Sequence, residues 1–456
     1  MNFHKIDWKL SPVEVFSRLV EQSDYAYILE SVEGPERLAE YSFVGLNPRL
    51  HVSVKDGAVE VHNLENDCKT RHHVDDPIPL LRALLIGFGR STANVARFIG
   101  GAVGYISYDA VRYWERLPRK TVDDFGFPDF ELAVYDDGVL FDHKRGEAYY
   151  YHYGDSRIRE IEHLIKEEPI LESLSFSSMK TSIEKEKFEE LVVRCKEYIQ
   201  SGDIFQAVLS KRFEFTFHGS LIPFYMALRR INPSPYMYFL KMGNRQIVGS
   251  SPEMLVRVEG GNVETFPIAG TRPRRPEKPL EDEALARDLL NDPKERAEHV
   301  MLVDLARNDI GKVCEYGSVH VPEFMKVYKY SHVQHMVSRV VGKLRKSFDC
   351  YDALRAVFPA GTVTGAPKVR AMEIIEELEP FRRGPYAGAV GYFSFNGNAD
   401  FAITIRTLVA YGTRAYIQAG AGIVADSIPE REWFETEHKA QALLRALQTA
   451  SGEKPP

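Results

Sequence analysis

Residues 358–372 read FPAGTVTGAPKVRAM, and this stretch joins a glycine-rich loop to a helical pattern. Pro367 suits the first position of a helix, where no amide donor is needed. The junction is expected to offer free backbone N–H groups and hydroxyls to an anion. It lacks the GKS or GKT ending of a nucleotide P-loop, and a capped buried helix explains the stretch equally well. Helical spacing follows at Val369, Met372, Ile375 and Leu378.

The composition is that of an ordinary soluble chain. It has 456 residues, 44% of them hydrophobic and 27% charged, with a formal net charge of −7. This balance argues against a nucleic-acid partner, and no apolar run is long enough to cross a membrane. The cysteines are too far apart for a Cys-pair zinc site or a secreted disulfide framework, so we expect a cytoplasmic protein. They are Cys68, Cys195, Cys314 and Cys350.

The chain divides into two regions. Residues 1–166 alternate short strands and turns, including a hairpin over 51–62 that turns at Asp56-Gly57. Residues 167–182 mix acidic residues, Pro and Ser, and this predicts a linker. Residues 183–449 carry the longer helical patterns. The expected helices cover about 182–200, 223–230, 281–309, 351–357, 367–378 and 430–449.

Two of these helices carry Glu-x-x-Glu. Glu295 pairs with Glu298, and Glu432 with Glu435; residues three apart share a helix face, roughly 5–6 Å between Cβ atoms. Two such pairs brought together would make a four-carboxylate site that suits Mg²⁺. An arbitrary pair of this kind usually faces solvent. However, Glu298 and Glu435 lie on apolar stripes, where an unpaired carboxylate is costly.

Further polar groups and glycines stand at expected strand and loop edges. Singly each is weak evidence, since a lone His is more often structural and Arg406 could be an ion-pair partner. Together with a metal they suit a small substrate that carries several carboxylates. They are Gly270, Thr271, His335, Tyr386, Arg406, Gly420, Gly422 and Lys439.

Six ordered motifs resemble the chorismate-utilising enzymes, and within that family the large subunits of anthranilate synthases. The resemblance covers about 183–448, and segments of the first region match as well. The motifs are PIAGTRPR (267–274), EHVMLVDLARND (298–309), GTVTGAPK (361–368), GAVGY (388–392), IRT (405–407) and AGAGIVADS (419–427).

The resemblance implies an α+β fold with four layers, α/β/β/α. Two stacked antiparallel sheets would be covered by helices, with the N- and C-terminal regions intertwined. It also implies that Glu298 and Glu435 bind Mg²⁺ directly, while Glu295 and Glu432 hold its waters. The substrate contacts that it implies are Gly270, Thr271, Thr362, Tyr386, Arg406, Gly422 and Lys439.

The implied reaction converts chorismate and ammonia to anthranilate and pyruvate, the first committed step of tryptophan biosynthesis. Glu253 would be the general acid for the departing hydroxyl, and His335 would lie near the leaving groups. Ammonia would come from a glutamine amidotransferase subunit. None of the four cysteines has the glycine-rich surroundings of a glutaminase nucleophile, so that activity is expected on a separate chain.

Two positions separate the subfamilies. Gln206 stands where isochorismate and salicylate synthases carry a lysine that activates water, and an amide cannot act as that base. Ala269 stands where most aminodeoxychorismate synthases carry a nucleophilic lysine. Both absences favour direct attack by ammonia. The alternative is an aminodeoxychorismate synthase component I that manages without the lysine.

Two segments match the tryptophan feedback pocket of this subfamily. Glu30 would hold the ammonium of the amino acid, and an apolar slot would hold its ring. A turn at a sheet edge without a ligand explains the same residues. A catalytically idle sensing subunit is a rival of another class. The proposed contacts are Glu30, Ser31, Pro235, Tyr236 and Met237.

Overall fold

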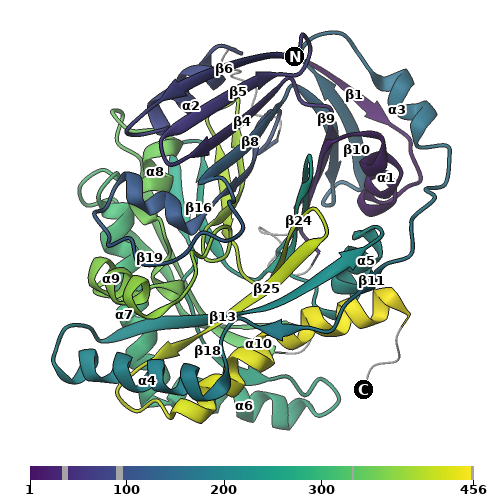
Figure 1. Cartoon of the computed structure of the whole chain (residues 1–456). Coiled ribbons are helices and arrows are strands. Elements are labelled where there is room, and N and C mark those ends of the chain that lie inside the picture. The colour runs from purple at the N-terminus through teal and green to yellow at the C-terminus, as the bar shows by residue number, and fades with distance from the viewer. Residues whose placement is uncertain (33–39, 89–95, 331–332, 453–456) are drawn as a thin grey trace.

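The computed structural model describes residues 1–32, 40–88, 96–330 and 333–452 and has two large antiparallel sheets with helices outside them (Figure 1). The first sheet runs in the order β1 (Asn2–Ile6), β10 (Glu147–His152), β9 (Asp137–Asp142), β3 (Tyr41–Leu46), β2 (Tyr25–Glu30), β14 (Tyr236–Met242), β15 (Arg245–Ser251), β24 (Thr407–Tyr411), β25 (Arg414–Ile423), β13 (Gln206–His218) and β11 (Ser175–Phe176). Two further strands pair with β13, namely β12 (Lys180–Thr181) and β21 (Gly365–Ala366).

One end of the second sheet is built from residues 183–449 and the other end from residues 1–166. Its order is β18 (Ile268–Pro273), β20 (Val333–Lys343), β17 (Asn262–Thr265), β16 (Met254–Glu259), β23 (Ala399–Ile403), β22 (Ala389–Ser394), β7 (Gly101–Ile106), β8 (Phe130–Tyr135), β4 (Leu50–Lys55), β5 (Ala58–Asn63) and β6 (Cys68–His73), with β19 (His320–Lys329) beside β20.

Helices cover the outer faces of both sheets. An apolar cluster joins α1, α5 and α10 to the first sheet, and another joins α2, α7 and α8 to the second. Helix α10, yellow in Figure 1, packs along β25. The helices are α1 (Pro12–Leu19), α2 (Ile78–Ile86), α3 (Ile158–Leu164), α4 (Lys185–Gln200), α5 (Ile222–Ile231), α6 (Pro279–Asn291), α7 (Pro293–Gly311), α8 (Cys350–Val357), α9 (Lys368–Leu378) and α10 (Pro429–Ser451), with short 3-10 turns η1 (Val20–Gln22), η2 (Tyr108–Tyr113) and η3 (Gly361–Val363).

An aromatic core lies between the two sheets. Tyr27 and Tyr238 come from the first sheet, and Tyr105, Tyr135 and Tyr392 from the second, and all are buried. Such rings bury large areas with defined packing geometry. With the outer helices, this core gives the expected α/β/β/α layers.

The two regions of the chain are intertwined in both sheets. Strand β2 pairs with β14, so that Glu30 lies opposite Met237. Strand β7 pairs with β22, and Gly104 lies opposite Gly391. A Cβ on Gly104 would stand 2.0 Å from Glu131 O of β8, and one on Gly391 would stand 2.0 Å from Asp400 O of β23. The intertwining expected from the resemblance is confirmed. The segment 167–182, expected as a linker, also contributes β11 and β12 to the edge of β13.

The loop before α9 is partly paired with the first sheet. Its residues Gly365–Ala366 form β21 on β13, and the amide of Thr364 donates to Gly361 O at 3.2 Å. Gly365 has φ +143°, and its Cβ would stand 2.1 Å from Gln206 O. This part of the junction is therefore held by the protein itself, and anion binding at the junction stays a prediction. Pro367 precedes the helix as its N-cap rather than occupying its first turn.

Candidate functional site

The two glutamate pairs approach each other from α7 and α10. Burial raises the pKa of Glu298, and the carboxylates of Glu295 and Glu435 raise it further. Burial likewise raises the pKa of Glu432, with a contribution from Glu435. The four carboxylates therefore share one region of negative potential, which a divalent cation would relieve.

Each of three carboxylates is bound by a donor of the chain itself. Gln206 Nε2 donates to Glu298 Oε1 at 3.2 Å. Arg272 Nη1 lies 3.3 Å from Glu295 Oε1, and Lys439 Nζ lies 2.7 Å from Glu435 Oε1. Within the described ranges, no three acidic, His or Cys side chains already converge closely enough to hold a metal ion. The residues fit a cation by charge, and binding would require them to turn toward it.

Glu253 is a buried carboxyl between β15 and β16. Burial raises its pKa to about 8, although the nearby Thr362 hydroxyl favours the ionised form. Glu253 and Thr362 line the same cavity of about 40 Å³. Thr362 Oγ1 is buried and makes no hydrogen bond of normal geometry there. A buried carboxyl with a raised pKa therefore lies beside the buried Thr362 hydroxyl, and this pair suits a polar group of a bound molecule.

Gly270, Thr271 and His335 form a second wall of the site. Gly270 interrupts the pairing of β18 with β20 and has φ +68°, and its Cβ would lie 2.9 Å from Glu295 Oε2. His335 Nδ1 donates to Gly270 O at 3.0 Å and lies 3.1 Å from Thr271 Oγ1. Burial lowers the pKa of His335, so its ring is neutral near pH 7 and Nε2 carries the lone pair.

Glycines of β25 make room for the side chains opposite. A Cβ at Gly422 would lie 2.6 Å from Gln206 Nε2, and one at Gly420 would lie 2.8 Å from the Tyr386 hydroxyl. Arg406 has φ +52° and donates from Nη1 to Lys439 O at 3.2 Å. Burial lowers the pKa of its guanidinium, and Glu435 acts against that shift. The residues expected from separate motifs are thus close together in the fold.

The family model described as chorismate binding enzyme matches residues 25–445. The chain belongs to this family. A protein of Methanothermobacter marburgensis, "Anthranilate synthase component 1", is 50% identical over 98% of this chain and 94% of that protein. A protein of the same name from Saccharolobus solfataricus is 44% identical over 99% of this chain and 100% of that protein. The resemblance inferred from the motifs is confirmed.

Solved structures share the fold of this chain. Anthranilate synthase component I from Streptococcus pneumoniae gives a TM-score of 0.79 at 39% identity, over 90% of this chain and 93% of that one. The isochorismate synthase MenF of Escherichia coli gives a TM-score of 0.73 at 20% identity, over 98% of this chain and 95% of that one. This likeness concerns the fold alone.

The segments expected to bind tryptophan meet where β2 pairs with β14. Glu30, Ser31, Tyr236 and Met237 line one cavity of about 50 Å³. Ser31 Oγ donates to Pro235 O at 2.7 Å, which ties the two segments together. Glu30 is buried and accepts from Tyr225 and from Arg229. A ligand ammonium would therefore share Glu30 with the guanidinium of Arg229.

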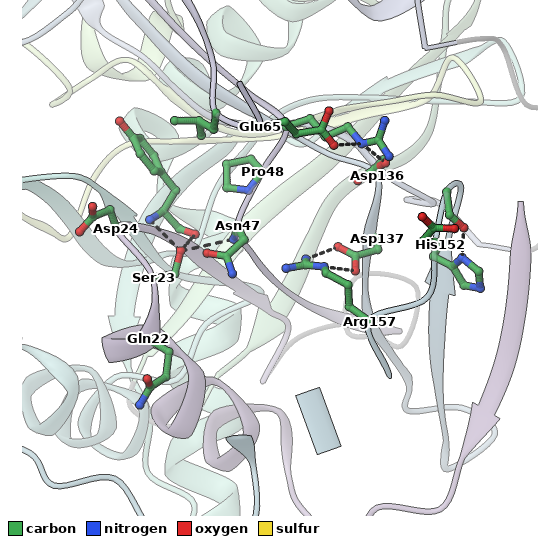
Figure 2. Close-up of a pocket in the computed structure, with 15 residues that line it drawn as sticks. Gln22, Ser23, Asp24, Asn47, Pro48, Glu65, Asp136, Asp137, His152 and Arg157 are labelled. Atoms are coloured by element: carbon green, nitrogen blue, oxygen red, sulfur yellow. Dashed lines mark hydrogen bonds and ion pairs between the residues drawn. The ribbon is translucent and has the colours of Figure 1, made fainter. Parts of the chain in front are cut away.

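A larger cavity, of about 590 Å³, lies entirely in the first region (Figure 2). Its two arginines are already paired. Arg157 forms a forked contact with Asp137, and Arg49 contacts Asp136 and Glu65. None of the catalytic motifs contributes to its lining. The size of this cavity therefore does not mark it as the reaction site.

Two further ion pairs in or near the motifs were not predicted from the sequence. Lys368 is partly buried, and its Nζ donates to Asp309 Oδ2 at 2.6 Å, which braces α9 against α7. Arg383 is buried and binds Glu379. Lys368 and Asp309 each end a quoted motif, and that position was the available signal. Nothing in the sequence around Arg383 indicated its burial.

Proposed function

We propose that this chain is an anthranilate synthase large subunit, which converts chorismate and ammonia to anthranilate and pyruvate. The observation that carries the proposal is the buried carboxyl of Glu253, which lines a cavity with Thr362 and whose pKa burial raises to about 8. Hydroxide is a poor leaving group, and a carboxyl that stays protonated near pH 7 can convert it to water. The curated relatives named anthranilate synthase component 1 support the same reaction.

Each residue has a defined part in the proposed reaction. Ammonia adds to C2 of the ring while the C4 hydroxyl leaves with the proton of Glu253. Loss of the enolpyruvyl group as pyruvate, with the C2 proton, then restores the aromatic ring. Tyr386, Arg406 and Lys439 hold the carboxylates of the substrate at their end of the site. His335, neutral and fixed by Gly270, lies near the departing groups without an assigned proton.

Mg²⁺ is the metal proposed for the glutamate pairs. Glu298 and Glu435 would hold it directly, and Glu295 and Glu432 through water. When bound, it would neutralise and orient the ring carboxylate of chorismate. Burial, and after it the repulsion from Glu295 and Glu435, raises the pKa of Glu298, and this supports a cation at this place. Hard oxygen donors without sulfur or nitrogen suit Mg²⁺.

Product identity is the test of this function. The purified chain, given chorismate, Mg²⁺ and concentrated ammonium salt at alkaline pH, should yield fluorescent anthranilate and pyruvate. Chelation of Mg²⁺ should stop turnover, and Glu298→Gln should lower it by about 100-fold or more because the metal loses a charged ligand. Aminodeoxychorismate without pyruvate would instead identify the aminodeoxychorismate synthase alternative. Absence of turnover would favour a sensing subunit.

The ammonia source is proposed to be a separate glutamine amidotransferase subunit. Burial raises the pKa of Cys195 to about 12 and of Cys314 to about 11, the opposite of nucleophile activation. Burial also raises the pKa of Cys350. All four thiols are unpaired, which fits a reducing cytoplasm.

Among the helices that the structure describes, none is long and apolar enough to cross a membrane.

Tryptophan is proposed as a feedback inhibitor that binds at Glu30, Ser31, Pro235, Tyr236 and Met237. Ser31→Phe should raise the inhibitory tryptophan concentration by about tenfold or more, because the added ring fills the small cavity. The activity without tryptophan should stay within a few fold. Inhibition curves measured with ammonium as nitrogen donor check this. Ser178→Phe, at an exposed position, is the control; unchanged inhibition in Ser31→Phe would remove the site from consideration.

A further inference from the structure

The ammonium of Lys439 contacts a carboxylate that the proposed metal needs. Lys439 Nζ lies 2.7 Å from Glu435 Oε1 and donates to Gly420 O at 2.9 Å. The two side chains are one turn apart on α10 and are 37% and 45% exposed, so neither is locked in place by burial. Lys439 thus supplies at Glu435 the positive charge that a metal ion would otherwise supply.

The donors on the other carboxylates differ from Lys439. Arg272 also binds Asp288 at 2.7 Å and Asp292 at 3.0 Å, so it keeps anionic partners when Glu295 turns away. Gln206, which donates to Glu298, is neutral, so it competes with a cation only by occupying the space beside the carboxylate. Lys439 therefore combines a full charge with direct contact to a proposed ligand.

We propose that Lys439 is an internal competitor of the metal ion, and that the substrate relieves the competition. This inference rests on the proposed function. An ammonium and a divalent cation on one carboxylate repel each other strongly at contact distance. A carboxylate of chorismate offers Lys439 another anion and frees Glu435 for the metal. Each ligand then raises the affinity of the other by the same factor.

The first experiment measures metal affinity without chorismate. Wild-type protein and Lys439→Met are titrated with Mg²⁺, and with Mn²⁺ as a second probe, by calorimetry. The variant should bind metal about tenfold more tightly or better, because the competing charge is gone. Arg445→Met is the matched control. It removes one positive charge from the same helix, about 15 Å along the axis from Glu435 and beyond the screening length, and should leave the affinity unchanged.

The second experiment measures coupling. With saturating chorismate and no ammonia, wild-type protein should bind Mg²⁺ more tightly than without chorismate, and Lys439→Met should show a smaller gain. Equal metal affinity in wild type and Lys439→Met without chorismate would overturn the inference and leave the proposed reaction intact. Absence of metal binding in both proteins would overturn it together with the proposed metal site. Glu298→Gln should lose metal binding in either background and so identifies the site titrated.

Discussion

Replacing Glu253 with glutamine is expected to lower kcat for anthranilate formation by about 10²–10⁴-fold. Burial raises the pKa of Glu253 to about 8, so most of the enzyme carries the acid form at neutral pH. Glutamine keeps the shape of the side chain but has no acidic proton for the departing hydroxyl. Steady-state rates at saturating chorismate and ammonium measure the effect. The KM for chorismate should change only a few fold, because the carboxylate contacts lie elsewhere in the site.

The matched control is Glu283→Gln, an exposed glutamate of α6 that should leave kcat unchanged. Wild-type kcat/KM, expressed per unit of free ammonia, should fall above about pH 8 as Glu253 loses its proton. A Glu253→Gln enzyme with kcat within threefold of wild type would remove the general-acid role of this residue.

The same substitution should change how stability depends on pH. The folded chain raises the pKa of Glu253 from 4.5 to about 8, so it keeps a proton that the unfolded chain releases. Wild-type stability should therefore fall by about 1.4 kcal/mol per pH unit from this group between those two values. Glutamine does not titrate. The melting temperature of Glu253→Gln minus that of wild type should therefore increase from pH 5 to pH 8. Above pH 8 this difference should stay constant.

Local elements could be predicted from the sequence because their signals are local. The hairpin expected over 51–62 is β4 and β5, and its turn has φ +46° at Asp56 and +82° at Gly57. The helix expected over 430–449 lies within α10. In each case the residues that define the element are neighbours, so spacing alone identifies it.

The pairing of distant strands did not follow from spacing. Nothing local to β2 indicates β14 as its neighbour, and the layers were expected only because the motifs resemble a known family. The pairing of the loop before α9 was equally out of reach. The sequence left open whether its glycines serve an anion or a buried helix start, and the structure shows that Gly365 lets β13 pass within contact distance.

The sequence proposed which residues form the site but not which side chains of the same chain bind them. Motif positions identified Glu295, Glu298 and Glu435, yet not that Arg272, Gln206 and Lys439 would bind them. Arg272 and Gln206 come from other elements than their partners, so these contacts depend on the folded backbone. Lys439 and Glu435 are one turn apart on the same helix. That spacing was available in the sequence, but it does not tell whether the pair is formed.

Replacing Arg383 with methionine is expected to destabilise the fold by about 3–5 kcal/mol, the usual cost of breaking a buried ion pair. Arg383 binds both oxygens of Glu379, and it donates to Val363 O at 2.8 Å and to Val208 O at 2.7 Å. Its loss leaves a buried carboxylate without its cation and two carbonyls without a donor. Urea unfolding and calorimetry measure the loss, and Arg194→Met on the exposed face of α4 is the control.

The same arginine joins the parts of the proposed active site. Val363 belongs to η3 beside Thr362, Val208 follows Gln206 on β13, and the guanidinium lies 5.7 Å from the ring centre of Tyr386. Arg383→Met should therefore also raise the KM for chorismate. Adding Glu379→Gln removes the unpaired charge, so the double variant should recover part of the stability but not the KM. If the single variant unfolds at the same urea concentration as wild type, the ion pair does not hold these elements together.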